Sequence, residues 1–182
     1  MAAQNIPIVF QEKMNICQLG VNPADVKFGS VTMTSSKYLC AKDSTSTPPS
    51  LSVIELDTRQ SSKFPFAGDN AIMNPISKII GLRAGQKLQI FNIDLKSKMK
   101  HFDMSSPVAF WTWISPTVIA IVTNSACFHW SIEGDAKPVK VFDRHASLAG
   151  CQIINYKASS DGKWLCVIGI KKGSQGGIAG AM

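Results

Sequence analysis

The stretch AIMNPISKIIGLRAGQKLQIFNIDLKSKMK, residues 71–100, decides the fold. It contains two short apolar runs, residues 78–82 and residues 88–93, which have the length of β-strands. Between them lies Gly85, in a turn where a glycine easily adopts a positive φ. The pattern predicts two consecutive antiparallel strands joined by a tight turn.

The second of these runs carries large side chains on both of its faces. In an extended strand Leu88 and Ile90 face one way, whereas Gln89, Phe91 and Ile93 face the other. This arrangement predicts a strand that is buried on one side and available for binding on the other.

Three lysines alternate with other residues directly after this strand. If residues 96–100 are extended, the ammonium groups of Lys96, Lys98 and Lys100 lie on one face at intervals of about 6–7 Å. An apolar strand beside a row of lysines suits an acidic, extended peptide. The plainer interpretation is that Phe91 packs in the core and that the lysines form a solvated face.

The composition is that of one ordinary globular domain, residues 1–182. The chain has 45% hydrophobic and 17% charged residues, which is enough for a core and low in charge. A net charge of +7 favours acidic partners, namely nucleic acid, anionic lipid or acidic peptides. Charge alone does not choose among these partners.

The five cysteines are odd in number and scattered, with no CxxC spacing and no histidine at a zinc-ligand distance. They predict reduced, structural thiols and a cytosolic compartment. The N-terminus shows no signal-peptide pattern, and no apolar run reaches the roughly 18 residues of a membrane-spanning helix. No metal or cofactor is expected.

Further strands are predicted from short apolar or alternating runs along the whole chain. They fall at residues 6–10, 28–33, 37–42, 51–57, 108–114, 117–123, 126–132, 137–142, 151–156 and 164–170. Residues 58–70 are predicted to be an irregular connection, and residues 171–182 lack strand periodicity. No helix longer than a turn or two is expected.

A loose repeat relates four of these runs. KYLCAK, KIIGLR, TVIAIV and KWLCVI start at Lys37, Lys78, Thr117 and Lys163, which are 41, 39 and 46 residues apart. A period near 40 residues with four short strands per unit is typical of a β-propeller blade, and a β-sandwich has no reason to show it. The expected fold is therefore all-β, with about three to four blades of a larger propeller, since closed propellers have about four to eight.

Several runs resemble the N-terminal domain of the clathrin heavy chain. They occur in order at residues 71–75, 88–93, 96–100, 129–134, 142–145 and 147–156. The resemblance extends from about residue 6 to residue 182, whereas the Trp-Asp signature of the commonest propellers is absent. It implies that residues 1–182 are the incomplete, N-terminal part of a seven-bladed terminal propeller. The leg, the light-chain site and the trimerisation region of that family would lie outside this sequence.

The resemblance also implies a function without catalytic chemistry. Propellers of this family bind short linear motifs of endocytic adaptor and accessory proteins in grooves between blades, at the cytosolic face of coated pits and vesicles. Contact with the membrane would be indirect, and no nucleic acid would be bound. The alternative that the residues leave open is a basic propeller scaffold that binds nucleic acid or acidic head groups through charge.

Two peptide-binding grooves are carried over residue by residue. The groove between the first two blades, for acidic-apolar "clathrin box" motifs, corresponds to Ile80, Gln89, Phe91, Lys96 and Lys98. A second groove, for Trp-containing motifs, corresponds to Phe28, Gln152, Ile154 and Ile170.

Four positions of the first groove depart from the family pattern. Phe64 replaces the usual Arg, Phe66 and Ser62 each replace an Ile, and Lys87 replaces a Thr. These changes predict an altered affinity or motif preference.

Other residues with chemical potential favour structural roles. The four tryptophans are expected to pack between blades. Asp143-Arg144-His145 beside a serine is only a weak indication of nucleophilic chemistry, because a catalytic triad is a spatial arrangement.

Overall fold

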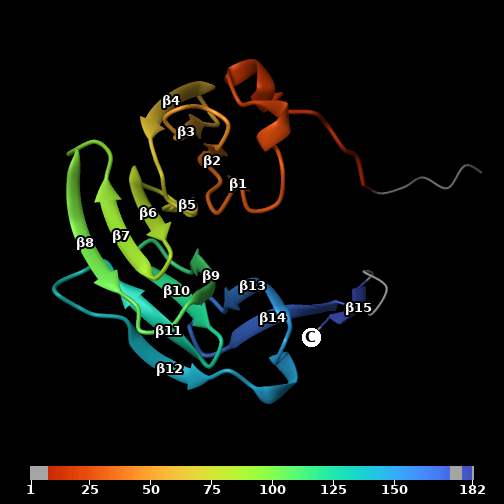
Figure 1. Cartoon of the computed structure of the whole chain (residues 1–182), viewed down its shortest axis with the longest axis vertical. Coiled ribbons are helices and arrows are strands. Elements are labelled where there is room, and N and C mark those ends of the chain that lie inside the picture. Colours follow the sequence, from red (N-terminus) through yellow and green to blue (C-terminus); the bar gives the residue numbers. More distant parts are fainter. Residues whose placement is uncertain (1–7, 173–177, 182) are drawn as a thin grey trace, which may run out of the picture.

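A computed structural model describes residues 8–172 and 178–181 (Figure 1). The fold is all-β, with four antiparallel sheets that follow one another in an arc. The first three sheets have four strands each and the fourth has three. We call the sheets the first to the fourth blade. In the part of the chain that the structure describes, no helix is long and apolar enough to cross a membrane.

The strands run in chain order within each blade. The first blade contains β1 (Val31–Thr32), β2 (Tyr38–Asp43), β3 (Ser50–Glu55) and β4 (Gln60–Pro65). The second contains β5 (Asn70–Met73), β6 (Ile79–Ala84), β7 (Lys87–Asn92) and β8 (Ser97–Asp103). The third contains β9 (Val108–Trp113), β10 (Val118–Thr123), β11 (Ala126–Ser131) and β12 (Val139–Asp143). The fourth contains β13 (Gln152–Ala158), β14 (Leu165–Lys172) and β15 (Ile178–Ala181).

Three short 3₁₀ turns complete the secondary structure, η1 (Ile16–Leu19), η2 (Pro23–Asp25) and η3 (Ala146–Leu148). The first two precede the first blade, and apolar residues around η1 pack on the face of that blade opposite the second blade, together with Val21, Leu39, Ala41 and Ile54. The third leads into the fourth blade.

The four repeated runs form the second strand of each blade, namely β2, β6, β10 and β14. Each of these strands has neighbours on both edges, and β6 and β10 also lie between two other blades, so a continuous apolar run is what they require. The strand β10, for example, is buried at five of its six residues. The outer strands β4 and β12 are almost entirely exposed.

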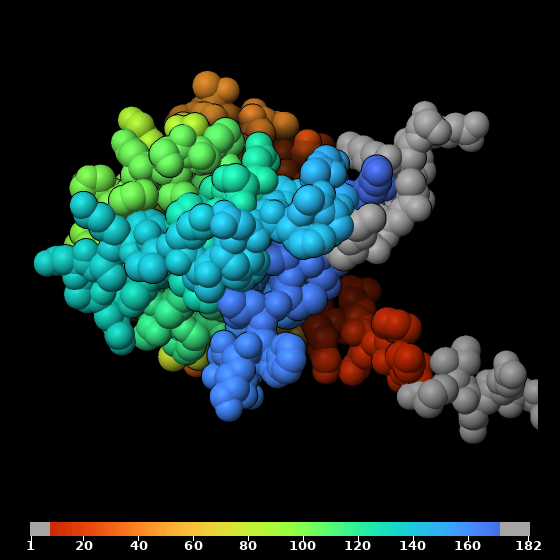
Figure 2. Space-filling model, turned by 90° about the horizontal axis from the view of Figure 1, so that it is seen from below, coloured from red at the N-terminus to blue at the C-terminus, as the bar shows by residue number. Residues whose placement is uncertain are grey.

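Apolar clusters fill the spaces between successive blades. Between the first and second blades the buried members are Tyr38, Cys40, Leu51, Val53, Ala71, Met73 and Ile80. Larger side chains, including Trp111, Trp113 and Trp130, fill the space between the second and third blades. The space-filling view shows the third blade packed against its neighbours on both sides (Figure 2).

Hydrogen bonds to the innermost strand β5 also link the blades. Hydroxyl groups of the first blade donate to carbonyl oxygens in and after β5: Thr32 to Ala71 (2.6 Å), Thr34 to Met73 (2.8 Å) and Ser35 to Pro75 (3.0 Å). From the third blade, the indole of Trp111 donates to the side chain of Asn70 (2.7 Å), and that of Trp113 to the carbonyl of Ile72 (3.2 Å). The strand is therefore held from both sides.

The structure corrects several of the predicted strands. Residues 60–65 form β4 rather than part of an irregular connection, and residues 70–73 form β5. Of the strand predicted at residues 6–10, the described residues 8–10 have no strand partner, and the side chains of Ile8, Val9 and Phe10 are 63%, 88% and 93% exposed. The strand predicted at residues 28–33 shortens to β1. Residues 178–181, predicted to lack strand structure, form β15.

Candidate functional site

A groove of about 280 Å³ lies between the first and second blades. Its lining is almost wholly apolar, and one amide side chain is its main polar group. The residues that line it are Leu51, Phe64, Pro65, Phe66, Ile80, Leu82, Gln89, Phe91 and Ile93. The groove therefore contains five of the residues that the sequence assigned to the first site or to its divergent positions.

Strand register explains why these side chains meet. In the first blade Leu51 of β3 pairs with Phe64 of β4, and paired residues of an antiparallel sheet project on the same side. In the second blade Ile80 of β6 pairs with Phe91 of β7, and Leu82 pairs with Gln89. The two walls are thus opposing faces of neighbouring sheets. Gln89, Phe91 and Ile93 all line the groove, so the prediction that these three side chains face the same way is confirmed.

A glycine makes room for one wall of the groove. A Cβ atom at Gly68 would overlap the ring of Phe66 and would lie 2.6 Å from the carbonyl oxygen of Arg83. The chain can therefore turn from the first blade into the second, with the Phe66 ring lying against it, only if residue 68 has no side chain.

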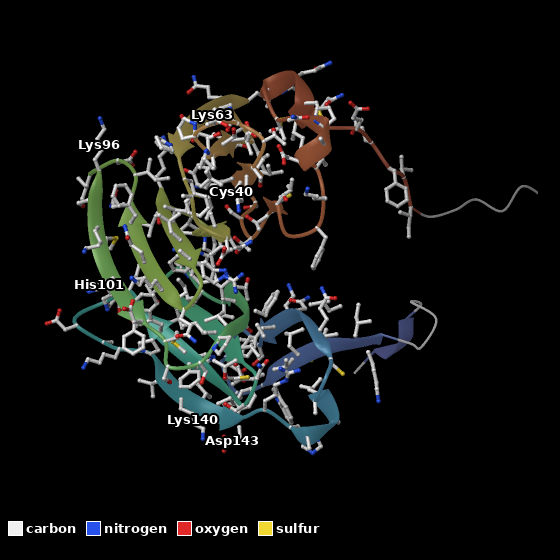
Figure 3. All side chains as sticks on the ribbon, in the orientation of Figure 1. Cys40, Lys63, Lys96, His101, Lys140 and Asp143 are labelled. Carbon is white, nitrogen blue, oxygen red and sulfur yellow. The ribbon has the colours of Figure 1, made fainter. Side chains whose placement is uncertain are left out.

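The predicted row of three lysines does not form. The register between β7 and β8 shifts at a β-bulge, so that Lys98 pairs with Phe91 whereas Lys100 pairs with Ile90. Lys98 therefore projects on the groove side, and Lys100 projects towards the third blade. Lys96 has a left-handed backbone, with φ of 49°, and lies at the tip of the β7–β8 turn (Figure 3).

Lys100 is used structurally. Its ammonium group donates to the carbonyl oxygens of Ser131 (2.8 Å), Glu133 (2.9 Å) and Ala136 (3.3 Å) in the third blade. Lys87 pairs with Ala84 and lies two residues before Gln89, so that it extends the groove side of β7 past its apolar part.

A polar pocket of about 180 Å³ continues the groove at its other end. It shares Phe64 and Ile93 with the groove, and its other lining residues are Tyr38, Val53, Glu55, Gln60, Ser62, Lys78 and Asp94. Burial raises the pKa of the Tyr38 hydroxyl, and the nearby carboxylate of Glu55 raises it further. Of these residues, Ser62 and Phe64 were predicted from the sequence as divergent positions of the groove. The two acidic residues of the pocket, Glu55 and Asp94, lie 39 residues apart in the chain. They reach the same pocket only because the first and second blades pack against each other.

Residues of the second predicted groove are only partly brought together. Gln152 of β13 pairs with Ile170 of β14, and Ile154 lies at a bulge in the same strand pair. Phe28 belongs to the connection before β1, where it bridges to Val31 and is 81% exposed. A hollow of about 660 Å³ beside Gln152 has a mixed lining, in which Arg144 and Lys171 are the charged residues.

The segment Asp143-Arg144-His145, which gave a weak indication of nucleophilic chemistry in the sequence, makes structural contacts. Asp143 forms an ion pair with Lys140 at 2.6 Å on the outer edge of the third blade (Figure 3). Arg144 donates to the carbonyl oxygens of Thr123, Leu148 and Cys151. His145 accepts a hydrogen bond from the backbone of Ser147 and so caps η3. Within the described residues, no group of three His, Cys, Asp or Glu side chains is placed to hold a metal ion.

Three tryptophans are buried between blades, as predicted, but Trp164 is not. Trp164 is 78% exposed directly before β14, so the expectation that it packs between blades is wrong. All five cysteines are free thiols, of which Cys40, Cys127 and Cys151 are buried.

Comparison with known proteins identifies relatives over almost the whole chain. It is 44% identical to human clathrin heavy chain 2 over 181 residues, 99% of this chain. It is 44% identical to the Drosophila melanogaster clathrin heavy chain over 98% of its length, and 45% identical to Arabidopsis thaliana clathrin heavy chain 1 over 96%. The chain is a homologue of the clathrin heavy chains. It spans about 11% of the length of these clathrin relatives. No protein-family model matches it.

Solved structures support the fold independently of the clathrin sequences. The chain superimposes on the β-propeller domain of Cps50 (Swd1) from Myceliophteria thermophila with a TM-score of 0.55 at 10% identity, covering 85% of this chain and 54% of that one. It matches Kluyveromyces lactis Hsv2 with a TM-score of 0.51 at 12% identity, over 76% of this chain and 39% of that one. The clathrin homologue thus has the architecture of an incomplete β-propeller.

Proposed function

We propose that this chain is the front part, residues 1–182, of the terminal propeller of a clathrin-type vesicle-coat protein, and that it binds short linear motifs of adaptor and accessory proteins. The protein would act without enzymatic chemistry at the cytosolic face of coated pits and vesicles, and would reach the membrane through its adaptors. Trimerisation and light-chain binding would belong to other parts of such a coat protein.

The observation that carries the proposal is the apolar groove between the first two blades. A groove of about 280 Å³ accommodates a few side chains of an extended peptide, and its aromatic and aliphatic walls suit leucine-like residues. Phe64, Phe66 and Phe91 are the aromatic members of this lining. Burial of each leucine would contribute about 1.5–3 kcal/mol before the cost of ordering the peptide.

Polar groups at the groove would fix the direction of the peptide and favour acidic residues. The side-chain amide of Gln89 forms no hydrogen bond with any described residue, so both its donor and its acceptor are free for a peptide backbone. Lys98 projects from the adjacent strand on the same side as Phe91 and would pair with an acidic residue. Lys96 and Lys87 would add positive charge at the two ends of β7.

The test is a fluorescence-polarisation titration with a labelled peptide that carries leucines and acidic residues. Gel filtration and circular dichroism first establish that each sample is folded. We expect saturable binding that is weakened by Gln89→Ala and by Lys96→Glu. The matched controls Gln86→Ala, in the exposed β6–β7 turn, and Lys157→Glu, on the exposed surface of the fourth blade, should bind like the unsubstituted chain.

Salt dependence separates this function from the charge-driven alternative. Binding of a nucleic acid or of acidic head groups should fall steeply with ionic strength, in proportion to the number of charges neutralised. Binding anchored by leucines should weaken only modestly. No binding by a well-folded chain would contradict the assignment of the groove.

A further inference from the structure

The polar pocket at the Phe64–Ile93 end of the groove has a charge character opposite to that of the lysines along β7 and β8. Three lining residues carry charge, namely Glu55, Asp94 and Lys78, which gives the pocket a formal charge of −1. Among the described residues neither carboxylate forms an ion pair within 4 Å, and neither does the ammonium group of Lys78.

Strand register places this polar surface in line with the apolar groove. Tyr38 of β2, Glu55 of β3 and Gln60 of β4 pair across the first blade and project on one side. The neighbouring rows of the same blade lead to Leu51 and Phe64, which line the groove itself. A peptide extended along the groove therefore meets the Tyr38–Glu55–Gln60 row next.

The hydroxyl of Tyr38 is the decisive feature of the pocket. The Tyr38 side chain is only 6% exposed, yet its hydroxyl forms no hydrogen bond with any residue that the structure describes, and the residue lines the pocket. A phenol in such surroundings normally has a partner. The hydroxyl is not among the buried atoms without a partner, so it is accessible at the pocket that Tyr38 lines and is available to bond a ligand group there.

The surroundings of this hydroxyl are electrostatically negative. The carboxylates of Glu55, Asp94 and Asp57 all act on it in the direction of raising its pKa, and only Lys78 opposes them. The carboxylate of Glu55 accepts one hydrogen bond, from Thr58 (2.8 Å), and retains further acceptor positions. The pocket therefore offers several acceptors and a net negative charge to an incoming group.

We propose that this pocket is a subsite for an arginine or lysine side chain of the peptide whose apolar residues fill the groove. A guanidinium group carries five N–H donors in one plane, so it can donate to the carboxylates of Glu55 and Asp94 and to the oxygen of the Tyr38 hydroxyl together. The inference rests on the proposed function, and it adds that the recognised motif carries a basic residue beside its apolar residues and an acidic residue near Lys98.

The experiment compares peptides that share one leucine-rich, acidic core and differ only in one flanking residue. Arginine, citrulline or glutamate is placed before the core in one set and after it in a second set, because the direction of the peptide is not assumed. Citrulline has the shape of arginine without its charge. Affinities are measured with the unsubstituted chain and with Glu55→Gln, Asp94→Asn and Tyr38→Phe. The control variants are Glu133→Gln and Asp135→Asn, at exposed positions of the third blade.

We expect the arginine peptide of one set to bind about three- to tenfold more tightly than its citrulline counterpart. This advantage should shrink in Glu55→Gln and Asp94→Asn and persist in both controls. Equal affinity of arginine and citrulline peptides in both sets, or tighter binding of glutamate, would overturn the subsite while leaving the groove intact. Absence of binding by every peptide would overturn the proposed function and the subsite with it. If a variant fails to fold, the arginine–citrulline comparison on the unsubstituted chain still decides.

Discussion

Lys98 and Lys100 stand two residues apart on β8 but project from opposite faces of the second blade. The β-bulge between them places Lys98 opposite Phe91 and Lys100 opposite Ile90. Lys98 thereby projects on the groove side of the second blade, whereas Lys100 reaches the third blade and donates to three of its carbonyl oxygens. The two lysines therefore have separable roles.

The pair Lys98→Met and Lys100→Met tests this separation. Lys98→Met should weaken binding of an acidic peptide severalfold and leave thermal stability unchanged, because its ammonium group bonds no described residue. Lys100→Met should leave peptide affinity nearly unchanged and lower the free energy of unfolding by about 0.5–1.5 kcal/mol, because three carbonyl groups of the third blade lose a charged donor. Urea unfolding and polarisation titrations of both variants measure the two effects. Similar behaviour of the two variants in both assays would contradict the assignment.

Gly81 of the second blade lies against the ring of Trp111 of the third blade. A Cβ atom there would lie 3.0 Å from the ring of Trp111 and 3.1 Å from Ile72. Gly81→Ala should therefore lower the free energy of unfolding by about 1–3 kcal/mol, since an overpacked core shifts its neighbours. Ser61→Ala, on the exposed strand β4, is the control and should be close to neutral. An alanine at residue 81 that stabilises the chain would show that the blades can move apart.

Asn74 is fully buried and links the β5–β6 connection to the β9–β10 connection. Its amide donates to the carbonyl oxygen of Pro116 (2.6 Å), and its side-chain oxygen accepts from Ile76 and Ser77. Asn74→Ala leaves these groups without partners and should cost about 2–4 kcal/mol of stability. Thermal and urea unfolding measure the loss, with the exposed Asn124→Ala as the matched control. Equal stability of the two variants would show that the Asn74 side chain does not stabilise the contact between the blades.

Acid should destabilise the first blade through Asp43. Its carboxylate accepts hydrogen bonds from Lys63 (3.1 Å), from the backbone of Ser46 (2.9 Å) and from Thr45, and these hold its pKa well below the usual range. Because the pKa is lower in the folded than in the unfolded chain, the ionised form stabilises the fold. That stabilisation is complete above about pH 5 and is lost as the pH falls through the folded-state pKa. Urea unfolding of the original chain and of Asp43→Asn should differ most near pH 7, and the difference should shrink progressively as the pH falls below about 5; a constant difference would argue against the linkage.

The parts of the fold that were predictable are the strands with two neighbours and two covered faces. The runs starting at Lys37, Lys78 and Thr117 are apolar because burial on all sides leaves no place for polar side chains, and their spacing of about 40 residues is the length of one blade. The outer strand β4, with the sequence QSSKFP, was missed because it contacts only one neighbour and faces solvent. Its strand structure comes from pairing with β3 and leaves no apolar pattern.

The apolar part of the candidate site was predictable for a similar reason. Gln89 and Phe91 alternate with Leu88 and Ile90, so the two faces of β7 can be separated in the sequence alone. The prediction of a lysine row was wrong because a β-bulge in β8 inserts one residue and changes the alternation of the side chains. No residue type in the sequence indicates this bulge. The polar pocket was missed because its members come from two blades and become neighbours only when the blades pack.

The hydrogen bonds that hold β5 have a consequence for how such propellers could be recombined. The hydrogen-bond donors on the two sides of β5 differ in type. Hydroxyl groups donate from the first blade, and indole N–H groups donate from the third. A blade transplanted or duplicated at this position would have to present backbone acceptors on its innermost strand and supply donors of its own to the next blade. A few Thr, Ser, Asn and Trp side chains around the innermost strands would then decide which blades can be neighbours. The apolar side chains between the sheets would have to match in volume.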